Sequence, residues 1–596
     1  MATNDSTYLD TTEVVMTNLT NVMSANQTFF EKLASLPAKL SGHQGLLYLE
    51  ARIVFASLAC IYIGSHAALR RPPSAKPKRD KGKAKGKQKD EENDQFVQGL
   101  APSDAILFPI MAGVVLVGLY YLITWLDDPD IINKILRTYF SFTSLAAMGK
   151  LFADSLHLLT GFVFPTVWSA RDGRLYHIDA VKRGQWYMIG NSESQVWNGK
   201  KTSPFPGPWS ELNLSDARNR MLWEVRHLFL EPWTVDFWIH GIVREKFQIK
   251  LNDIVGVVLA VGASLIYNSF KSTFLSNVMG YAFSYVVIVM MSPTTFTTGS
   301  LVLFGLFFYD IYMVFYTPYM VTVATKLDVP IKLVFEGPTR ASMLGLGDIV
   351  LPGIFIALCL RFDHYMYYYR RQKLVPVELK TEEEASSGQV VTTTRETQRM
   401  VVKPHYVNPQ GQWGDRFWSA NGLLGSISLL SSTSETAATP ALRASAFPKT
   451  YFRVAMAGYL VAMLVTLAML LVFNHAQPAL LYLVPGVVAA AWLTGAARRE
   501  LREMWAYTED GSLDKEDVVV EVDENGEVVK RIGAKGDDDD AAGTEGKGVA
   551  KERDAEKSKA EKKSTKDAKV SRAVVHFSIY PPSPLSEEAL SGCDDK

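Results

Sequence analysis

The chain has 596 residues, 48% of them hydrophobic, and its 62 basic side chains balance its 62 acidic ones. Equal totals of the two signs say little about binding partners by themselves. We expect no nucleic-acid partner. The three cysteines, Cys60, Cys359 and Cys593, are too few and too scattered for a disulfide framework or a cysteine metal site, so we expect plain core thiols.

Nine apolar stretches predict an all-α polytopic membrane protein with about nine transmembrane helices. Each block is about 20 residues long, which is the length that crosses a bilayer, and the charged residues are gathered into the loops between them. The predicted spans lie near residues 47–69, 105–126, 137–164, 253–269, 274–292, 298–317, 341–361, 452–473 and 478–497.

The N-terminal segment is predicted to be lumenal. It lacks the basic start and apolar core of a signal peptide, but it holds three Asn-x-Ser/Thr sequons, at Asn4, Asn18 and Asn26, which are candidates for glycosylation. The run "RRPPSAKPKRDKGKAKGKQK" after the first span predicts a basic cytosolic linker at 70–98. The N-terminus is then lumenal and the C-terminus cytosolic.

The charges of the remaining loops agree with this orientation, while Asn213 begins a sequon in a loop predicted to be cytosolic, where it would stay unmodified. The predicted lumenal loops 127–130 and 474–477 carry no Lys or Arg, whereas the predicted cytosolic ends read "RRQK" at 370–373 and "RRELR" at 498–502. Cytosolic loops are the ones that collect positive charge.

The spans and loops predict seven parts of the chain. They are a lumenal segment at 1–46, helices one to three with the basic linker at 47–166, a Trp-rich cytosolic insertion at 167–252, helices four to seven at 253–361, a Ser/Thr-rich cytosolic loop at 362–450, helices eight and nine at 451–498, and a charged cytosolic tail at 499–596.

The two insertions and the tail differ in composition. The insertion 167–252 holds seven of the twelve tryptophans, which is too aromatic for a disordered linker, so we expect structure that packs on the membrane face. The loop 362–450 is expected to be mobile. The tail is expected to be disordered apart from a small hairpin around Asn525-Gly526, a dipeptide that favours a tight turn between strands.

A carboxylate lies inside an apolar span. The stretch "LVLFGLFFYDIYMVFYTPYMVTVA" places Asp310 near its middle. An ionisable residue deep in a bilayer costs at least a few kcal/mol, so it is a candidate for a transport pathway, a proton relay or a reaction centre.

A second carboxylate lies in the next span. Asp348, in "ASMLGLGDIVLPGIFIALCL", follows Gly345 and Gly347, which let another backbone come close. Pro352 lies four residues later and has no N–H, so the carbonyl of Asp348 loses its helical partner. Freed backbone groups in lipid are tolerated only where protein or a water-filled cavity surrounds them.

Two aspartates on neighbouring helices could share one proton, because like charges a few ångströms apart do not both ionise. The pair then offers an acid and a base together, as peptide hydrolysis by water requires. A single intramembrane Asp is more often a packing or transport residue, and Gly-x-Gly-Asp recurs by chance. Paired on adjacent spans, the two aspartates favour a reaction centre.

Other protease chemistries lack their parts. No His-Glu-x-x-His motif supports a zinc protease, no Gly-x-Ser-x-Gly turn supports a serine nucleophile, and no phosphate-binding glycine loop occurs. We therefore predict that neither a metal nor an organic cofactor is needed.

Three motifs together resemble a known family. "FYDIYMVF", "MLGLGDIVLPGIFIALCLRFD" and "HAQPALLYLVPG" closely resemble signal peptide peptidase, the presenilin-like family of Gly-x-Gly-Asp intramembrane aspartyl proteases, and the likeness extends through "PIKLVFEGP". It covers roughly the last six spans. The resemblance implies that Tyr309, Asp310, Gly345, Leu346, Gly347 and Asp348 hold the catalytic pair, and that Gln477, Pro478, Ala479 and Leu480 shape the active site and receive substrate.

The third motif depends on the resemblance. Pro478 could be only a first-turn proline, whose missing N–H costs a helix nothing. A second Pro-Ala-Leu at 440–442 lies in the Ser/Thr-rich loop and is predicted to be coincidental, because no apolar span follows it directly.

The resemblance further implies an enzyme of the endoplasmic reticulum membrane that cuts signal peptides and other type II segments. Its expected partners are transmembrane peptides and the bilayer, with a second copy or degradation machinery as further candidates. Two rival hypotheses stay open. One is a proton- or cation-coupled channel or transporter that relays charge through Asp310 and Asp348. The other is a non-catalytic binder of transmembrane helices.

Overall fold

The structure is a computed structural model. It describes residues 44–76, 98–125, 129–170, 174–188, 195–212, 214–239, 243–270, 272–326, 332–337, 341–376, 379–384, 390–395, 398–419, 440–473, 477–509, 518–522, 528–532 and 575–580. The sequons at Asn4, Asn18 and Asn26, most of the basic linker, the predicted turn at Asn525-Gly526 and Cys593 lie outside these residues. Two compact units form: one from 1–162, 255–375 and 401–517, the other from 163–254, 376–400 and 518–596.

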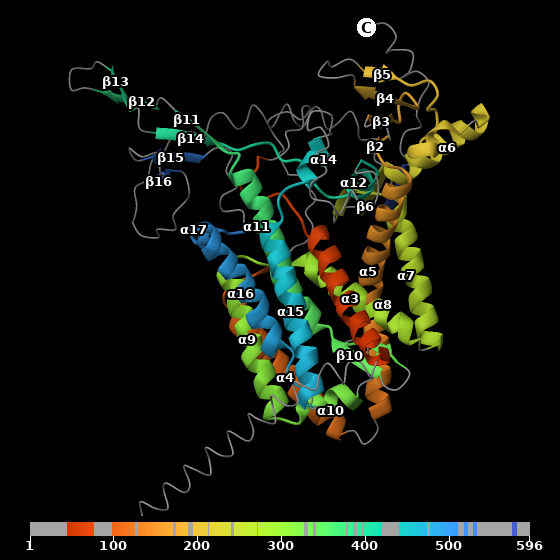
Figure 1. The fold of residues 1–596 in the computed structure, drawn as a ribbon, viewed down its shortest axis with the longest axis vertical. Helices are drawn as coiled ribbons and strands as arrows, with labels where there is room; N and C mark the ends of the chain where they lie inside the picture. Colours follow the sequence, from red (N-terminus) through yellow and green to blue (C-terminus); the bar gives the residue numbers. More distant parts are fainter. Residues whose placement is uncertain are drawn as a thin grey trace, which may run out of the picture. The chain divides into compact units, whose positions relative to one another are not determined.

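The first unit is a bundle of long helices (Figure 1). Within the described residues, eight helices are long and apolar enough to cross a membrane, and each matches a predicted span. They are α3 (Gln44–Ala67), α4 (Asp104–Trp125), α7 (Leu251–Phe270), α8 (Thr273–Met290), α9 (Phe296–Phe315), α11 (Gly347–Tyr369), α15 (Thr450–Phe473) and α16 (Leu480–Arg498).

The ninth predicted span, 137–164, lies within α5 (Pro129–Val163), which is not among the eight. At 1.5 Å per residue its 35 residues measure roughly 52 Å, longer than the hydrocarbon core of a bilayer. Lys150 and Asp154 interrupt its apolar stretch, and they form an ion pair of 2.9 Å one turn apart. α5 is therefore a helix of sufficient length but mixed polarity.

The helices differ in how much of their apolar stretch is buried, and α11 is the most buried of the eight. In α11, 89% of the apolar stretch is buried, whereas in α4 only 6% is. α11 packs against α3, α8, α9, α15 and α16. A helix that is apolar all round belongs in the interior of a bundle, while one that faces lipid needs no protein cover. α11 is the central helix, and Cys359 in it and Cys60 in α3 are buried free thiols as predicted.

Small residues let the helices approach closely. A Cβ added to Gly458 of α15 would lie 2.7 Å from the carbonyl oxygen of Gly486 in α16. A Cβ added to Gly353 of α11 would lie 2.7 Å from the side chain of Ile288 in α8. Membrane helices pack by such close contact because lipid provides no hydrophobic drive between them.

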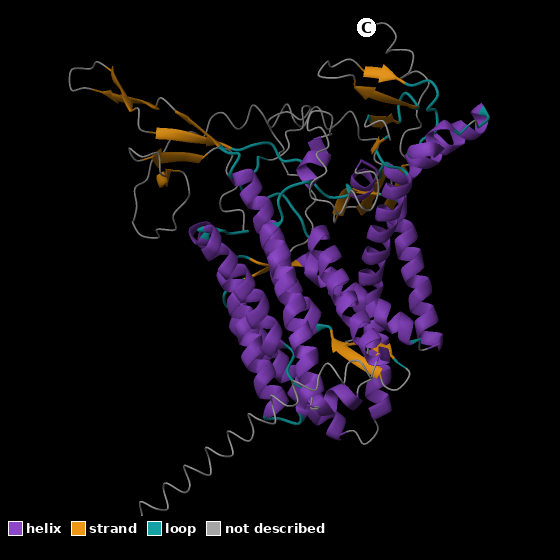
Figure 2. Cartoon of the chain, in the orientation of Figure 1, coloured by secondary structure: helices purple, strands orange, loops and turns teal. Residues whose placement is uncertain are grey.

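Short elements connect the long helices, as the cartoon in Figure 2 shows. Strand β1 pairs in parallel with β8, and β9 pairs antiparallel with β10. The short elements of the first unit are β1 (Gln98–Leu100), β8 (Met291–Pro293), α10 (Tyr319–Lys326), β9 (Lys332–Glu336), β10 (Ala341–Gly345), β11 (Lys373–Pro376), β14 (Gln398–Val402), α12 (Trp413–Ser419), α14 (Pro440–Ser445) and α17 (Leu501–Ala506). The loop predicted at 362–450 thus begins with the end of α11.

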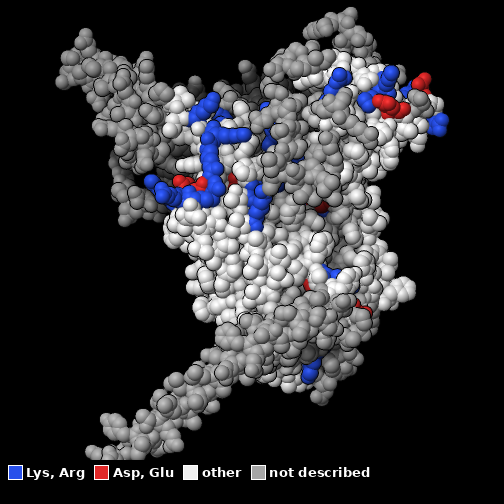
Figure 3. Space-filling model, viewed as in Figure 1, with Lys and Arg blue, Asp and Glu red and all other residues white. Residues whose placement is uncertain are grey.

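The body of the bundle is apolar on its outside. Figure 3 shows a white band across its middle, with Lys and Arg gathered toward one end. Many large apolar side chains on this exterior are exposed, among them Ile106, Leu107, Ile110, Val114 and Trp125 of α4. An exposed apolar surface of this extent suits contact with lipid and not with water.

A buried ionic cluster fastens the chain after α17 to the bundle. Glu509 bonds Arg70, which follows α3, and Arg361 of α11, whose Nε lies 2.6 Å from the glutamate oxygen Oε1. Ser292 of β8 donates to the same carboxylate, and the Glu509 N–H donates to the Thr294 carbonyl at 2.9 Å. Both Glu509 and Arg361 are almost completely buried. Paired burial of this kind is tolerated because every charge finds a partner.

The second unit holds most of the Trp-rich insertion. An antiparallel sheet of four strands joins β2 (Val167–Ser169), β3 (Leu175–Asp179), β4 (Gly184–Met188) and β5 (Gln195–Trp197). The Trp168 indole donates to Gln185 at 3.0 Å, and the Trp223 indole donates to the Thr202 carbonyl at 2.9 Å. The prediction that this insertion is folded is confirmed, while its place at the membrane face stays a prediction.

The other described elements of the second unit are a 3-10 helix, an α-helix and three further sets of paired strands. These are η1 (Gly207–Glu211), α6 (Asp216–Leu230), β6 (Trp233–Ile239), β7 (Val243–Ile249), β12 (Leu379–Glu384), β13 (Val390–Arg395), β15 (Val518–Val522), β16 (Val528–Ile532) and β17 (Val575–Tyr580). β12 pairs with β13, and β15 with β16, in antiparallel fashion. The latter pair forms the predicted hairpin strands.

The prediction of a tail disordered beyond that hairpin is wrong at two places. Strand β17 pairs antiparallel with β6, from Val575 opposite Ile239 to Tyr580 opposite Thr234. The sequence "VHFSIY" alternates apolar and polar residues, which is the pattern of a strand. The prediction missed this strand because the sequence before it is mostly charged. Residues 501–509 also belong to the bundle through α17 and Glu509.

We expect Glu509→Gln to lower the stability of the bundle at neutral pH by about 3 kcal/mol, because it leaves two arginines with less negative charge in a buried place. Burial alone would raise the pKa of the Glu509 carboxyl, but Arg361 and Arg70 hold that pKa below its ordinary value. The stabilisation is therefore present above the pKa of an unfolded glutamate and is lost as the pH falls below about 4.

Thermal unfolding of the full chain in detergent, followed at pH 7 and at pH 4, measures this effect. Glu231→Gln, at the exposed end of α6, is the matched control and should leave the transition unchanged. A Glu509→Gln transition equal to that of the wild type at pH 7 would contradict a stabilising role for the cluster.

Candidate active site

Asp310 lies in the last third of α9 and is almost fully buried, with 5% of its surface exposed. The helix that positions it begins at Thr295, whose side-chain oxygen accepts the Thr298 N–H at 3.0 Å. Such a cap fixes where the helix starts, and hence which face each later residue occupies. α9 packs against α4, α11 and α16, so Asp310 points into the bundle.

Asp348 lies in the first turn of α11, directly after strand β10. It is only partly buried, and Gly345 and Gly347 beside it are exposed. A Cβ at Gly345 would lie 3.3 Å from the Asp348 oxygen Oδ2, so glycine leaves room for the carboxylate there.

Gly347 differs from Gly345 in its surroundings. A Cβ added to Gly347 would meet nothing within 4 Å among the described residues. Gly347 is exposed at the start of α11. That it lets another backbone come close stays a prediction.

The two carboxylates are brought together. α9 and α11 pack side by side, and Asp310 lies close enough to Asp348 to act on its charge. Asp310 is buried, and the residue Asp348 is partly buried. Tyr309, next to Asp310, is partly buried and packs against the main core.

The third motif contacts the pair through its backbone. α16 begins at Leu480, and the Leu480 N–H donates to the Asp310 oxygen Oδ2 at 3.2 Å. The first N–H groups of a helix have no partner within the helix and carry its positive dipole end, which favours a nearby carboxylate. Pro478 is buried just before this turn, and the Tyr482 hydroxyl donates to Gln477 at 2.6 Å.

The second Pro-Ala-Leu, at 440–442, has another place. Pro440 begins α14, a helix of six residues that is too short to cross a membrane. The two identical triplets therefore start two helices of different length, and the contact with Asp310 is made by the one at 478–480.

The backbone carbonyl freed by Pro352 has found a partner. Pro352 lies inside α11, and the Tyr459 hydroxyl of α15 donates to the Asp348 carbonyl at 3.3 Å. Tyr459 is fully buried. The irregular first turn of α11 is thus held from a neighbouring helix, and Tyr459 is a site residue that sequence reasoning missed. Only the unpaired carbonyl, and not its partner, could be read from the sequence.

A third carboxylate in the predicted spans was also missed. Asp154 of α5 accepts the Tyr285 hydroxyl of α8 at 2.5 Å and pairs with Lys150. The Lys-x-x-x-Asp spacing signals this local ion pair, because residues four apart face each other on a helix. Among the residues that the structure describes, no three or more His, Cys, Asp or Glu side chains could hold a metal ion together.

We expect Tyr459→Phe to loosen the start of α11, because it leaves the Asp348 carbonyl without its donor. An unpaired buried polar group costs roughly 1–3 kcal/mol, which corresponds to about fivefold or more faster hydrogen exchange of the Ile349 and Val350 amides. Mass spectrometry of deuterium uptake measures this exchange.

Tyr451→Phe makes the same chemical change on the same helix, but its hydroxyl donates to Glu500 at 2.8 Å. It should leave exchange at Ile349 and Val350 unaltered. If Tyr459→Phe and Tyr451→Phe gave equal exchange at these amides, the proposed support of Asp348 by Tyr459 would be refuted.

Comparisons with known proteins identify relatives of the chain. The chain is similar to intramembrane protease 2 of Caenorhabditis elegans, with 33% identity over 42% of the chain and 41% of that protein. It is similar to signal peptide peptidase of Mus musculus, at 31%, and of Homo sapiens, at 30%, each over 46% of the chain and 53% of the relative. The matches thus span about half the length of these relatives. No solved structure matches the chain significantly.

A family model described as signal peptide peptidase matches residues 90–511. This match contains α4, α9, α11 and α16, the helices of the two carboxylates and their neighbours. The chain belongs to the signal peptide peptidase family of intramembrane proteases.

Proposed function

We propose that this protein is an aspartyl endopeptidase that hydrolyses peptide bonds inside the membrane, with Asp310 and Asp348 as the catalytic pair. The observation that carries the proposal is their approach: two carboxylates from separate membrane-length helices that pack side by side lie close enough for the charge of Asp310 to act on Asp348. Like charges so near each other favour a state in which one is protonated and the other ionised.

The pair then performs both proton transfers of the reaction. The ionised carboxylate takes a proton from water while the water oxygen bonds to the carbonyl carbon, and the protonated one gives its proton to the carbonyl oxygen. In the second step the C–N bond breaks. The newly protonated carboxyl gives its proton to the leaving nitrogen, and the other carboxylate takes one from a hydroxyl of the intermediate. The starting state of the pair is restored.

The neighbouring groups support this chemistry. The Leu480 N–H, at 3.2 Å, gives Asp310 a fixed donor and orients its carboxyl group. The exposed glycines Gly345 and Gly347 leave space beside Asp348 for the backbone of a substrate. The Leu480 N–H that contacts Asp310 lies in the first turn of α16. The proposed role of Gln477, Pro478 and Ala479, which directly precede this turn, is to hold it in place.

The substrate class follows from the family. Two relatives bear the name signal peptide peptidase, and with the lumenal N-terminus expected from the sequons we propose type II membrane segments, such as signal peptide remnants, as substrates in the endoplasmic reticulum membrane. The lipid bilayer surrounds the enzyme and its substrate. A second copy or degradation machinery is a further expected partner.

We expect Asp310→Asn and Asp348→Asn each to lower cleavage at least about a hundredfold, because the amide keeps the size of the side chain and removes its proton chemistry. Expression and membrane insertion should be nearly unchanged. The measurement uses the purified full chain in phosphatidylcholine vesicles with a labelled type II transmembrane peptide.

Asp104→Asn, at the first residue of α4, is the matched control and should cleave as the wild type does. Near-normal turnover by either pair variant would eliminate the mechanism. If the wild-type protein held the peptide uncut, the protein would be a binder, and proton or cation flux through the vesicles without cleavage would identify a transporter.

Orientation decides which segments the pair can cut. In a variant without cysteines, we expect Glu336→Cys in strand β9 to react with an impermeant thiol reagent only from the lumenal side, because the sequons and the basic linker place 318–340 there. Labelling of microsomes before and after permeabilisation measures this. Reaction from the cytosolic side alone would reverse the topology and remove the argument for type II substrates.

A further inference from the structure

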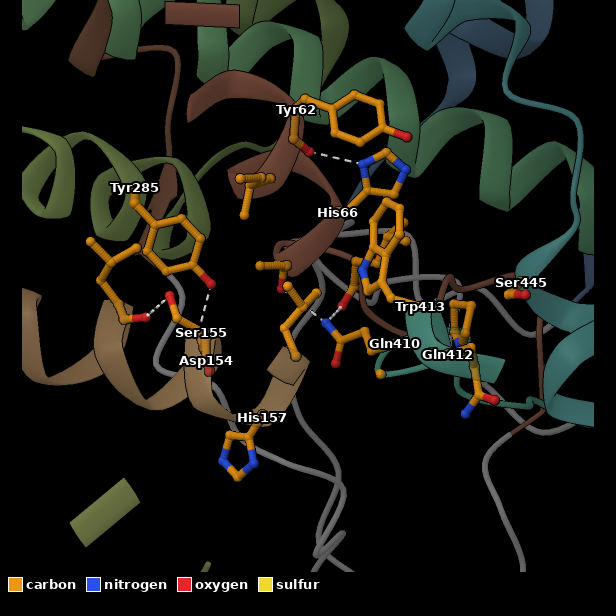
Figure 4. A pocket seen from close by; sticks show the side chains of 18 of the residues that line it. Tyr62, His66, Asp154, Ser155, His157, Tyr285, Gln410, Gln412, Trp413 and Ser445 are labelled. Carbon is orange, nitrogen blue, oxygen red and sulfur yellow. Dashed lines mark hydrogen bonds between the residues drawn. The ribbon is translucent and has the colours of Figure 1, made fainter. Parts of the chain in front are cut away.

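A cavity separate from the carboxylate pair lies in the helical unit. Its volume is about 640 Å³, within the range of sites that hold small molecules. Its walls come from α3, α5 and α8, and the segments 409–416 and 445–449 close one end (Figure 4). None of the three catalytic motifs lines it.

The closing segments are fixed to the helices. Gln410 donates to the carbonyls of Ala67 and Leu69, at 2.9 and 2.6 Å, and so caps the end of α3. The Trp418 indole donates to the Phe162 carbonyl near the end of α5, at 2.9 Å. The cavity is therefore a built feature of the fold.

One side of the cavity is apolar and faces outward. Ile63, Leu151, Phe152, Leu158 and Val278 line it. Ile63 and Leu158 have 47% and 40% of their surface exposed, although both lie on long helices of the bundle. An apolar wall with exposed aliphatic side chains at this position opens toward lipid.

The closed end is basic. Lys449 and Arg416 both line the cavity, and Arg453 lies close enough to act on both. The Lys449 ammonium lies 3.0 Å from His66 Nε2, while His66 Nδ1 lies 2.8 Å from the Tyr62 carbonyl. Because a carbonyl only accepts, Nδ1 carries the hydrogen and Nε2 accepts from Lys449. Figure 4 shows His66 and Trp413 together on this wall.

Two acids near this end, among the residues that the structure describes, are already engaged. Asp363 acts on Lys449, but its two oxygens accept the N–H groups of Tyr451 and Phe452, at 3.2 and 2.9 Å. Asp154, the acid that lines the cavity, accepts from Tyr285 and pairs with Lys150. Burial lowers the pKa of Lys449, and Arg416 and Arg453 lower it further, to about 7. An anion at this end would compensate the cluster.

We propose that the cavity binds an anionic phospholipid of the bilayer, with the phosphate against Lys449 and Arg416 and an acyl chain along Ile63, Leu151 and Leu158. Basic pockets between transmembrane helices recognise anionic head groups in this way. The combination of cationic end and outward apolar wall requires a ligand with both parts, which a free phosphate ion lacks. This site is independent of peptide hydrolysis by Asp310 and Asp348.

The test uses Trp413 as a reporter in the full chain, reconstituted in vesicles of phosphatidylcholine. A small fraction of brominated phosphatidylserine or of brominated phosphatidylcholine is included, because bromine quenches a nearby indole. We expect brominated phosphatidylserine to quench more strongly, and the difference to disappear in Trp413→Phe. Lys449→Gln and Arg416→Gln should each reduce the preference for the anionic lipid at least about threefold.

Lys373→Gln, an exposed cation of β11, removes the same charge outside the cavity and should retain the wild-type preference. Ser155→Phe, which fills the cavity from α5, should reduce quenching by both lipids. Equal quenching by the two lipids in the wild type, or an unchanged preference in both Lys449→Gln and Arg416→Gln, would overturn the proposal. Relief of the quenching by inorganic phosphate alone would show that the site takes a soluble anion instead.

Discussion

The structure of this bundle depends on one constraint, that a backbone polar group inside a bilayer needs a partner from the protein. Two such groups are open at the site: the Asp348 carbonyl, freed by Pro352, and the Leu480 N–H at the start of α16. Each finds a side chain of another helix, Tyr459 and Asp310 respectively. These two hydrogen bonds, made at irregular turns of α11 and α16, link the four helices α9, α11, α15 and α16 around the carboxylate pair.

The same constraint explains why α11 is central. α11 has a proline and an acid in its first two turns. Lipid offers no hydrogen-bond partner to the carboxylate or to the freed backbone carbonyl, so such a helix is poorly suited to face lipid. Its burial by five neighbouring helices supplies the partners. At its other end, Arg361 and Asp363 meet Glu509 and the start of α15, so both ends of α11 are fixed by polar contacts that come from distant parts of the sequence.

Much of the fold was predictable because membrane length and apolarity are local properties of the sequence. Eight of nine predicted spans are helices long and apolar enough to cross a membrane, and the two aspartates were found from their charge in apolar surroundings. What could not be predicted depends on tertiary contact. Tyr459 looks like any aromatic residue of α15 until its partner is known, and β17 is a strand only because β6 offers an edge. The different surroundings of Gly345 and Gly347 have the same origin, because a glycine pattern does not say which of its members contacts a neighbouring side chain.

Two of the helices that line the cavity, α3 and α8, also pack against α11, the helix that carries Asp348. Ile61 of α3 and Ile288 of α8 both pack at Gly353 of α11, one and a half turns beyond Asp348, while other residues of α3 and α8 line the cavity. A protein interior tolerates few empty spaces, since atoms beside a void lose their packing contacts. A lipid bound in the cavity would supply packing contacts to the side chains of α3 and α8 that line it. The bilayer would then be a structural part of the bundle as well as the solvent around it.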